Sequence, residues 1–335
     1  MATVSRLASR LVVLCIVLES SVLAEFQIVE TDSHGLRITH NGHPFAEYVV
    51  DQGNKPYLWR VHGPTGKLMT RAYPMEDVEG ERKDHPHHRG ITFGHEGING
   101  VDTWAEEKTF VDYLDNPNRA EWAQGRLDAL GRIVHREYEE LSASAAQARF
   151  VEICDYHDRN GQKILAEKRT VTFRVTTNHR WIDFDQELIA SEGDLHFEDK
   201  KDSGLSIRIP TSMDVDSKLG GKIINSEGQT DKEAWSQPAN WCDYHGPVDG
   251  ETVGVAILNH PSSFRHPTRW HVRTYGLFTA NPFASKQFDS ANPDAAFVLK
   301  QGESLKLFHR FVFHSGNAET GKIAEAYDQY ASEKR

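Results

Sequence analysis

The segment Leu36-Arg37-Ile38-Thr39-His40-Asn41-Gly42-His43-Pro44-Phe45-Ala46-Glu47-Tyr48-Val49-Val50 places two strand-like runs on either side of Asn41-Gly42. Asn-Gly between two such runs is a strong signal for a two-residue hairpin turn, because both residues accept a positive φ. The segment therefore predicts an antiparallel hairpin in which residues 36–40 pair with residues 44–50.

Short alternating or β-branched segments, broken by Gly, Asn, Asp and Pro, continue along the chain. Further strands are expected at 149–156, 168–176, 181–190, 205–210, 252–259, 270–279 and 304–314. Three- and four-residue apolar spacing appears only near the end, at Ile323, Ala326, Tyr327 and Tyr330, and predicts a short C-terminal helix. With no fixed-period repeat or low-complexity linker, we predict an all-β protein: a large antiparallel β-sandwich over residues 25–335 as one domain. Two stacked smaller sandwiches are the alternative.

Residues 1–24 have the pattern of a secretory signal peptide. Arg6 and Arg10 precede the apolar run 11–18, and small or aliphatic residues lead to a plausible cleavage near Ala24. The run is shorter than the roughly 20 apolar residues that span a bilayer. We therefore expect an exported protein, periplasmic or secreted and not membrane-spanning. A lipoprotein attached through Cys15 and a buried N-terminal strand are the alternatives.

The composition excludes one large class of function. The 335 residues carry 38 basic and 49 acidic side chains, for a formal net charge of −11. Nucleic-acid binding needs a clustered surplus of Lys and Arg, which this chain lacks. Hydrophobic residues, at 38%, are sufficient for a buried core. Beyond the signal segment only Cys154 and Cys242 remain, and we expect two buried free thiols, with a disulfide as the alternative.

Four of the 18 histidines gather between Asp84 and Trp104, in the sequence DHPHHRGITFGHEGINGVDTW. Pro86 favours an extended His85, with residues 85 and 87 on one face, and a buried strand at 91–93 would bring His95 back beside them. Histidine exchanges protons near neutral pH and is a common metal ligand. The segment predicts a chemical site; a polar loop whose histidines only bind backbone is the alternative.

Two other segments could join this site. A charged turn at residues 198–204 precedes an alternating strand in which Arg208 is in phase with Ser206. Residues 260–276 contain three more histidines, and alternation would place His271, Arg273 and Tyr275 on one face. Aromatic and charged donors on one face suit a polyhydroxylated ligand. A solvated turn and a sandwich surface with satisfied polar groups are the respective alternatives.

Several of these motifs together resemble a known family. Residues 85–90 followed by 99–104, the turn at 199–204, and the segments 241–246 and 275–283 are similar to the bacterial domain labelled "PmoA-like", over residues 55–330. The resemblance implies a role with carbohydrates but names no reaction. The label refers to a multi-span membrane subunit of methane oxygenase, which a chain without a membrane span does not fit.

The stretch 85–104 is also distantly similar to aldose epimerases, the galactose mutarotase-like proteins, in which a His-rich stretch precedes a Trp on a large β-supersandwich. That similarity implies the same architecture. We expect an enzyme that acts on a sugar or oxidised sugar by His-mediated proton transfer, of epimerase, lyase or hydrolase type. Catalysis is assigned to His88, His95, His271 and Lys201, and substrate binding to Arg89, Trp104, Asp199, Arg208, Arg273 and Asn281.

Two other functions stay open. A divalent metal ion could be held by His85, His87, His88 and His95, with Glu96 or His271 as a further ligand. A non-catalytic carbohydrate-binding protein would account for the aromatic residues and the signal segment, but not for the density of His and Arg. In each case the expected partner is a carbohydrate or keto-sugar, not a nucleic acid.

Overall fold

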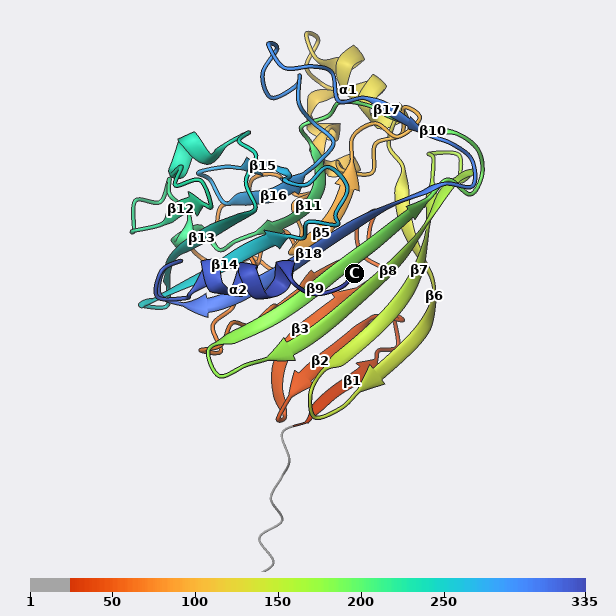
Figure 1. Cartoon of the computed structure of the whole chain (residues 1–335). Helices are drawn as coiled ribbons and strands as arrows, with labels where there is room; N and C mark the ends of the chain where they lie inside the picture. The colour runs from red at the N-terminus through yellow and green to blue at the C-terminus, as the bar shows by residue number, and fades with distance from the viewer. Residues whose placement is uncertain (1–24) are drawn as a thin grey trace, which may run out of the picture.

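The computed structural model describes residues 25–335, so the signal peptide predicted at residues 1–24 lies outside the described residues. Two eight-stranded antiparallel sheets form the body of the protein (Figure 1). The first sheet consists, in spatial order, of β1 (Phe26–Glu30), β2 (Leu36–His40), β3 (His43–Val49), β4 (Tyr57–Trp59), β5 (Ile91–His95), β11 (Ser203–Arg208), β16 (Leu277–Asn281) and β15 (Arg269–Val272).

The second sheet consists of β12 (Lys222–Asn225), β13 (Trp241–Val248), β14 (Glu251–Asn259), β18 (Ser304–Ser315), β9 (His179–Ile189), β8 (Lys163–Val175), β7 (Ala148–His157) and β6 (Arg132–Ala143). A small sheet pairs β10 (Leu195–Phe197) with β17 (Phe297–Leu299). The α-helices are α1 (Ala120–Asp128) and α2 (Ile323–Ala331), and the short 3-10 helices are η1 (Glu107–Thr109), η2 (Val111–Tyr113), η3 (Thr211–Met213) and η4 (Asp231–Ala234).

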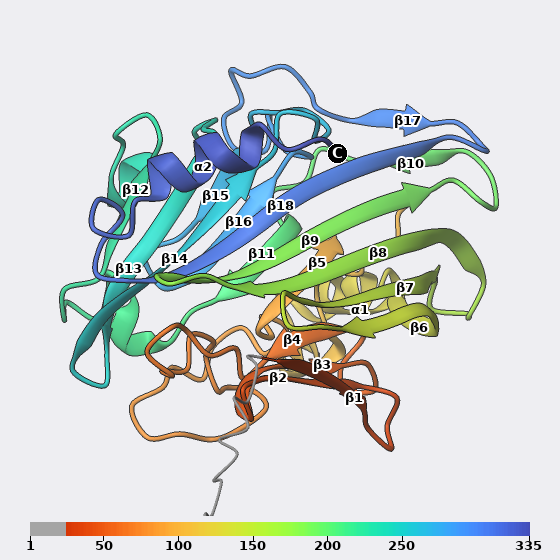
Figure 2. The same ribbon diagram turned by 60° about the horizontal axis from the view of Figure 1, so that its bottom comes forward.

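The two large sheets share one apolar core. Phe93 and Phe278 of the first sheet belong to the same buried cluster as Phe173 and Phe313 of the second. Figure 2 shows the sheets stacked, with α2 on the outer side of the second sheet, where the helix residue Tyr330 belongs to a separate apolar cluster. The predicted large antiparallel sandwich with a short C-terminal helix is confirmed.

The hairpin predicted at residues 36–50 is confirmed. β2 and β3 pair antiparallel with Leu36 opposite Tyr48, and the turn residues Asn41 and Gly42 have φ values of 54° and 76°. Positive φ at both central positions is the backbone form that Asn-Gly favours and that matches the twist of paired strands.

The single strand predicted at 270–279 is wrong. The chain reverses between β15 and β16, which pair with each other. Gly276 has a φ of +96° and donates its N–H to the carbonyl of Arg273, closing a tight turn. Arg273 and Tyr275 therefore lie in the turn beyond His271 instead of alternating with it along one strand.

Two further expectations concern the chain as a whole. Within residues 25–335 no helix is long and apolar enough to cross a membrane. Cys154 and Cys242 are both buried and free, in agreement with the prediction of two separate thiols.

The central strands of the first sheet have one apolar side and one polar side, and the candidate site lies on the polar side. On β11, Leu205 and Ile207 belong to the core cluster, so Ser206 and Arg208 project from the opposite side of the sheet. The same alternation places Thr279 of β16 on that side, because it pairs directly with Ser206. We call this side the polar face.

Candidate functional site

A row of polar side chains crosses the polar face from β4 to β15. Successive Cα pairings join Tyr57 to Thr92, Thr92 to Ser206, Ser206 to Thr279 and Thr279 to His271. Directly paired residues project to the same side of a sheet, so all five lie together. Every one of them is buried, although a polar row on the outer side of a sheet would ordinarily be solvated.

Three buried polar atoms on this face lack a hydrogen-bond partner within the described chain: Nε2 of His271, Oγ1 of Thr279 and Nε of Arg208. Buried polar groups are nearly always paired, so an orphaned group calls for an explanation such as a water or a ligand. Their grouping on adjacent strands marks this face as the candidate site.

His271 presents an unprotonated nitrogen. Its Nδ1 lies 2.6 Å from the carbonyl oxygen of Lys201. A carbonyl only accepts, so Nδ1 carries the hydrogen and Nε2 of the neutral ring keeps its lone pair. Burial lowers the pKa of His271 to about 4, so the ring is neutral at pH 7. Phe288 packs edge-on against it.

His88 has the opposite tautomer. Its Nδ1 lies 3.1 Å from Nη1 of Arg208, and a guanidinium only donates, so the ring hydrogen is on Nε2. Burial lowers the pKa of His88 well below its usual value, and the positive charge of Arg208 lowers it further. The site thus combines one imidazole that donates through Nε2 with another that accepts through Nε2.

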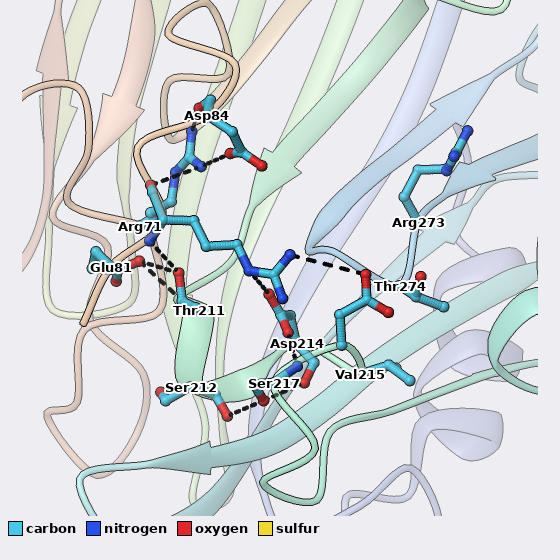
Figure 3. Close-up of polar contacts among 12 residues, drawn as sticks. Arg71, Glu81, Asp84, Thr211, Ser212, Asp214, Val215, Ser217, Arg273 and Thr274 are labelled. Atoms are coloured by element: carbon cyan, nitrogen blue, oxygen red, sulfur yellow. Dashed lines mark hydrogen bonds and ion pairs between the residues drawn. The ribbon is translucent and has the colours of Figure 1, made fainter.

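Asp84 binds two buried arginines. Its Oδ1 lies 2.5 Å from Nη1 of Arg71 and 2.8 Å from Nη2 of Arg208, and Figure 3 shows the contact with Arg71. Burial alone would raise the pKa of Asp84, but the hydrogen bond with His85 and the charges of both arginines hold it well below its usual value. The carboxylate fixes Arg208, which in turn orients His88.

Three histidine rings and a tyrosine pack beside this group. The ring of His85 stacks on His88, with centroids 4.9 Å apart, and on Tyr275, at 5.1 Å. His87 meets His88 edge-on at 4.3 Å. The extended His85 predicted from Pro86 is wrong: its φ is +45°, in the left-handed region. This backbone conformation at His85 allows its ring to stack on His88, whereas an extended chain would place successive side chains on opposite faces.

The strand register gives the distance between Arg208, which contacts His88, and His271. Arg208 is opposite Leu277, two residues from Thr279, and Thr279 is opposite His271. From Arg208 to His271 the face therefore spans two strand spacings and one two-residue step, about 12 Å between Cα atoms. One small ligand on this face can contact both groups.

His95 does not join the other histidines. It ends β5 opposite Ser203, at the far end of β11 from Arg208, which is about 17 Å of extended chain. Its Nδ1 accepts from the N–H of Gly97, and its ring meets Phe197 and Phe283 edge-on. The expectation that β5 brings His95 back beside the cluster is wrong, because the strand carries it away along the sheet.

The residues assigned to substrate binding are mostly occupied by structural contacts. Arg89 forms two hydrogen bonds with Glu106, and Trp104 is buried edge-on against His88. Asp199 accepts four backbone N–H groups of residues 285–295. Asn281 donates to the carbonyls of residues 200 and 201. Of the six, Trp104, Arg208 and Arg273 lie beside the His88 group.

Lys201 takes part through its backbone. Its carbonyl accepts from His271, whereas its ammonium is half-exposed and pairs with Asp202 at 2.9 Å. His260 and His266, from the same segment as His271, contact Glu333 and Tyr327 near the C-terminus. They are not part of the polar face.

The predicted metal ligands are not arranged for coordination. Within residues 25–335 no group of three or more His, Cys, Asp or Glu side chains could hold a metal ion. His85 and His88 stack ring on ring, and Nδ1 of His87 and of His88 already bond Thr109 and Arg208. The donor set proposed from the sequence therefore does not fit a metal.

Some residues of the site carry no sequence signal. Arg71 lies in an irregular segment 13 residues before its partner Asp84, and Thr279 is an ordinary strand residue until its pairing is known. Lys55 is buried, with its Nζ 2.7 Å from the carbonyl of Trp104, and burial lowers its pKa to about 8. No short-range pattern identifies any of the three.

Two cavities lie near these groups. The larger, about 910 Å³, is bordered by Lys55 and Glu106. The smaller, about 260 Å³, is lined by Lys232, Trp235, Val272, Arg273 and Thr274. The smaller one is joined to the polar face by aromatic contacts, since Trp235 packs on Phe288, which packs on His271.

Comparisons with solved structures give distant similarities. A galactose mutarotase-like protein from Clostridium acetobutylicum is 10% identical over 87% of this chain and 98% of its own, with a TM-score of 0.40. A putative aldose 1-epimerase from Escherichia coli K12 is 11% identical over 54% and 69%, with a TM-score of 0.29. A galactose mutarotase related enzyme from Lactobacillus acidophilus is 12% identical over 53% and 71%, with a TM-score of 0.27.

No curated protein sequence matches the chain significantly. The PmoA-like label, which the motifs suggested, stays a prediction. A family match covers residues 35–328, most of the chain, and the chain therefore belongs to the Family of unknown function (DUF6807).

Proposed function

We propose that the protein is an enzyme that acts on a sugar or oxidised sugar by proton transfer on the polar face. The observation that carries this proposal is His271, whose buried Nε2 has a free lone pair and no partner among residues 25–335, while Nδ1 is fixed by a backbone carbonyl. An oriented neutral imidazole of this kind is the form that accepts a proton.

His88 supplies the complementary group. Its Nε2–H donates to an oxygen of the ligand, and the neighbouring guanidinium of Arg208 stabilises negative charge that develops there. The step moves a proton from a carbon next to a carbonyl to Nε2 of His271, while the carbonyl oxygen gains negative charge. Protonation of the same carbon by solvent from the opposite face gives epimerisation. Departure of a β-substituent, which takes its bonding electron pair and a proton from solvent, gives elimination.

The hydroxyl row supports a polyhydroxylated ligand. Ser206 and Thr279 lie between Arg208 and His271, and Oγ1 of Thr279 has no partner in the described chain. Hydroxyl side chains both donate and accept, which matches the groups of a sugar. The exported location expected from residues 1–24 is part of the proposal.

The test uses His88→Gln and His271→Gln, assayed with a panel of aldoses and keto-sugars in deuterated water, with deuterium incorporation followed by NMR. Each positioned acid or base typically contributes about 10²–10⁴-fold, so each variant should lose at least about 100-fold in rate. The matched control is His34→Gln, an exposed histidine near the N-terminus, and it should keep the wild-type rate.

Thermal unfolding and circular dichroism of all three variants separate loss of chemistry from loss of fold. Wild-type rates in both site variants would overturn the proposal. Binding of sugars by the wild type without turnover of any of them would instead favour a carbohydrate-binding protein.

A further inference from the structure

The cavity of about 260 Å³ beside the polar face is rich in hydrogen-bond donors. Two of its five lining residues are basic, Lys232 and Arg273, and a third is Trp235. Nε1 of Trp235 is buried and has no acceptor within residues 25–335. No Asp or Glu lines this cavity in the described chain, so its side-chain chemistry favours an acceptor-rich, negatively charged ligand.

Arg273 is the central cation of this cavity. Its guanidinium lies over the rings of Tyr275, at 5.3 Å, and Trp235, at 5.8 Å. It forms no ion pair or side-chain hydrogen bond with any residue between 25 and 335, and Figure 3 shows it turned away from Asp214. A guanidinium has five donors in a rigid fork, and its position between two rings holds that fork in place.

The carboxylates near Arg273 already have other partners. Asp84 binds Arg71 and Arg208, and Asp202 binds Lys201. Asp214 and Asp216 lie 3.3 and 3.9 Å from nitrogens of Arg82. Among residues 25–335, neither of the two cations that line this cavity, Arg273 and Lys232, has a carboxylate partner.

The cavity lies at the end of the strand that carries the proposed base. Arg273 follows His271 by two residues, at the point where β15 enters the turn. The rings of Trp235 and Phe288 are 5.5 Å apart, and those of Phe288 and His271 are 5.8 Å apart. A ligand whose anionic group pairs with Arg273 can place its neighbouring carbon atoms toward His271.

We propose that the ligand of this site is a sugar acid, whose carboxylate is bound by Arg273 with the indole N–H of Trp235 as a further donor. The inference rests on the proposed function for the rest of the ligand. A carboxylate matches the planar guanidinium fork with two parallel hydrogen bonds, and Lys232 adds a second positive charge to the cavity. Pairing with Arg273 partly neutralises the carboxylate, which lowers the pKa of the adjacent C–H that the proposed proton transfer removes.

The experiment measures binding of D-glucuronate, D-glucose and D-glucose 6-phosphate to the full mature chain by isothermal titration calorimetry. Hydrogen bonds to a charged group contribute about 1.5–3 kcal/mol, so glucuronate should bind at least about tenfold more tightly than glucose. Arg273→Gln should remove this preference. Arg37→Gln, an exposed arginine on β2, is the matched control and should keep it.

Equal affinity for glucuronate and glucose, a preference for the phosphate, or no binding of any of the three would overturn the sugar-acid assignment. So would an unchanged preference in Arg273→Gln. The two proposals fail separately: Arg273-dependent binding of glucuronate without deuterium exchange would contradict proton transfer alone, whereas exchange of neutral sugars without an acid preference would contradict the sugar acid alone.

Discussion

Replacement of Asp84 by Asn tests the electrostatic support of the site. The carboxylate is the shared partner of Arg71 and Arg208, whose side chains are 0% and 1% exposed. Loss of one partner from a fully buried ion pair costs about 3–5 kcal/mol, because the other charge stays buried without compensation. The Asp84 side chain is 35% exposed, so solvent screens part of this effect. We expect Asp84→Asn to lower the free energy of unfolding by about 2–3 kcal/mol at pH 7.

The assay is urea unfolding of both proteins, with the slopes compared to verify that the unfolded states are alike. Asp77→Asn is the control: Asp77 pairs with Lys83 at 2.7 Å, but both side chains are more than half exposed, so the cost should stay below about 1 kcal/mol. An unfolding free energy for Asp84→Asn within about 0.5 kcal/mol of wild type would show that Asp84 does not stabilise the two buried arginines.

The pH dependence of this difference has a definite sign. The pKa of Asp84 is depressed in the folded protein, so its stabilisation is fully present above the unfolded pKa, near 3.9. The difference between wild type and Asp84→Asn should therefore be constant near neutral pH. Below about pH 4 it should decrease as the pH falls toward the folded pKa.

Two further predictions concern stability. Gly204→Ala should lower the free energy of unfolding in urea by about 2–4 kcal/mol, because residue 204 has a φ of +114° and a Cβ there would lie 2.1 Å from the carbonyl oxygen of Ala280. Gly125→Ala, in α1 with open space around it, should instead raise the free energy of unfolding by about 0.5–1 kcal/mol. Equal effects of the two substitutions would contradict this prediction. Burial alone would lower the pKa of His314, but the charge and hydrogen bond of Asp243 raise this pKa above its usual value. The pair of His314 and Asp243 should therefore stabilise the fold fully below about pH 6.5, and this stabilisation should be lost as the pH rises through the folded pKa of His314. Titration by NMR with a His314 pKa at or below 6.5 would show this to be incorrect.

Local patterns were sufficient for most of the fold. The Asn41-Gly42 hairpin and the C-terminal helix depend on neighbouring residues, and both are present. The alternation of residues 270–279 continues across the turn at residues 273–276, so the sequence pattern does not mark the reversal that the pairing of β15 with β16 and the positive φ of Gly276 show.

The site was predictable as a set of residues but not as an arrangement. The histidine-rich segment and His271 both belong to it, yet the positions of their side chains depend on strand register. His95 is excluded because β5 carries it along the sheet, and Arg208 is included because β11 ends beside His88. Such pairings join residues more than 100 positions apart, which no short-range pattern specifies.

The proposed proton transfer requires that the two imidazoles, His88 and His271, are both neutral and carry their ring hydrogens on different nitrogens at physiological pH. Two-dimensional ¹⁵N–¹H NMR of the histidine rings measures this directly, with His88→Gln and His271→Gln used to assign the signals. At pH 7 we predict the ring hydrogen on Nε2 in His88 and on Nδ1 in His271. A positively charged ring at either position, or a hydrogen on Nε2 of His271, would show that these residues cannot act as the proposed acid and base.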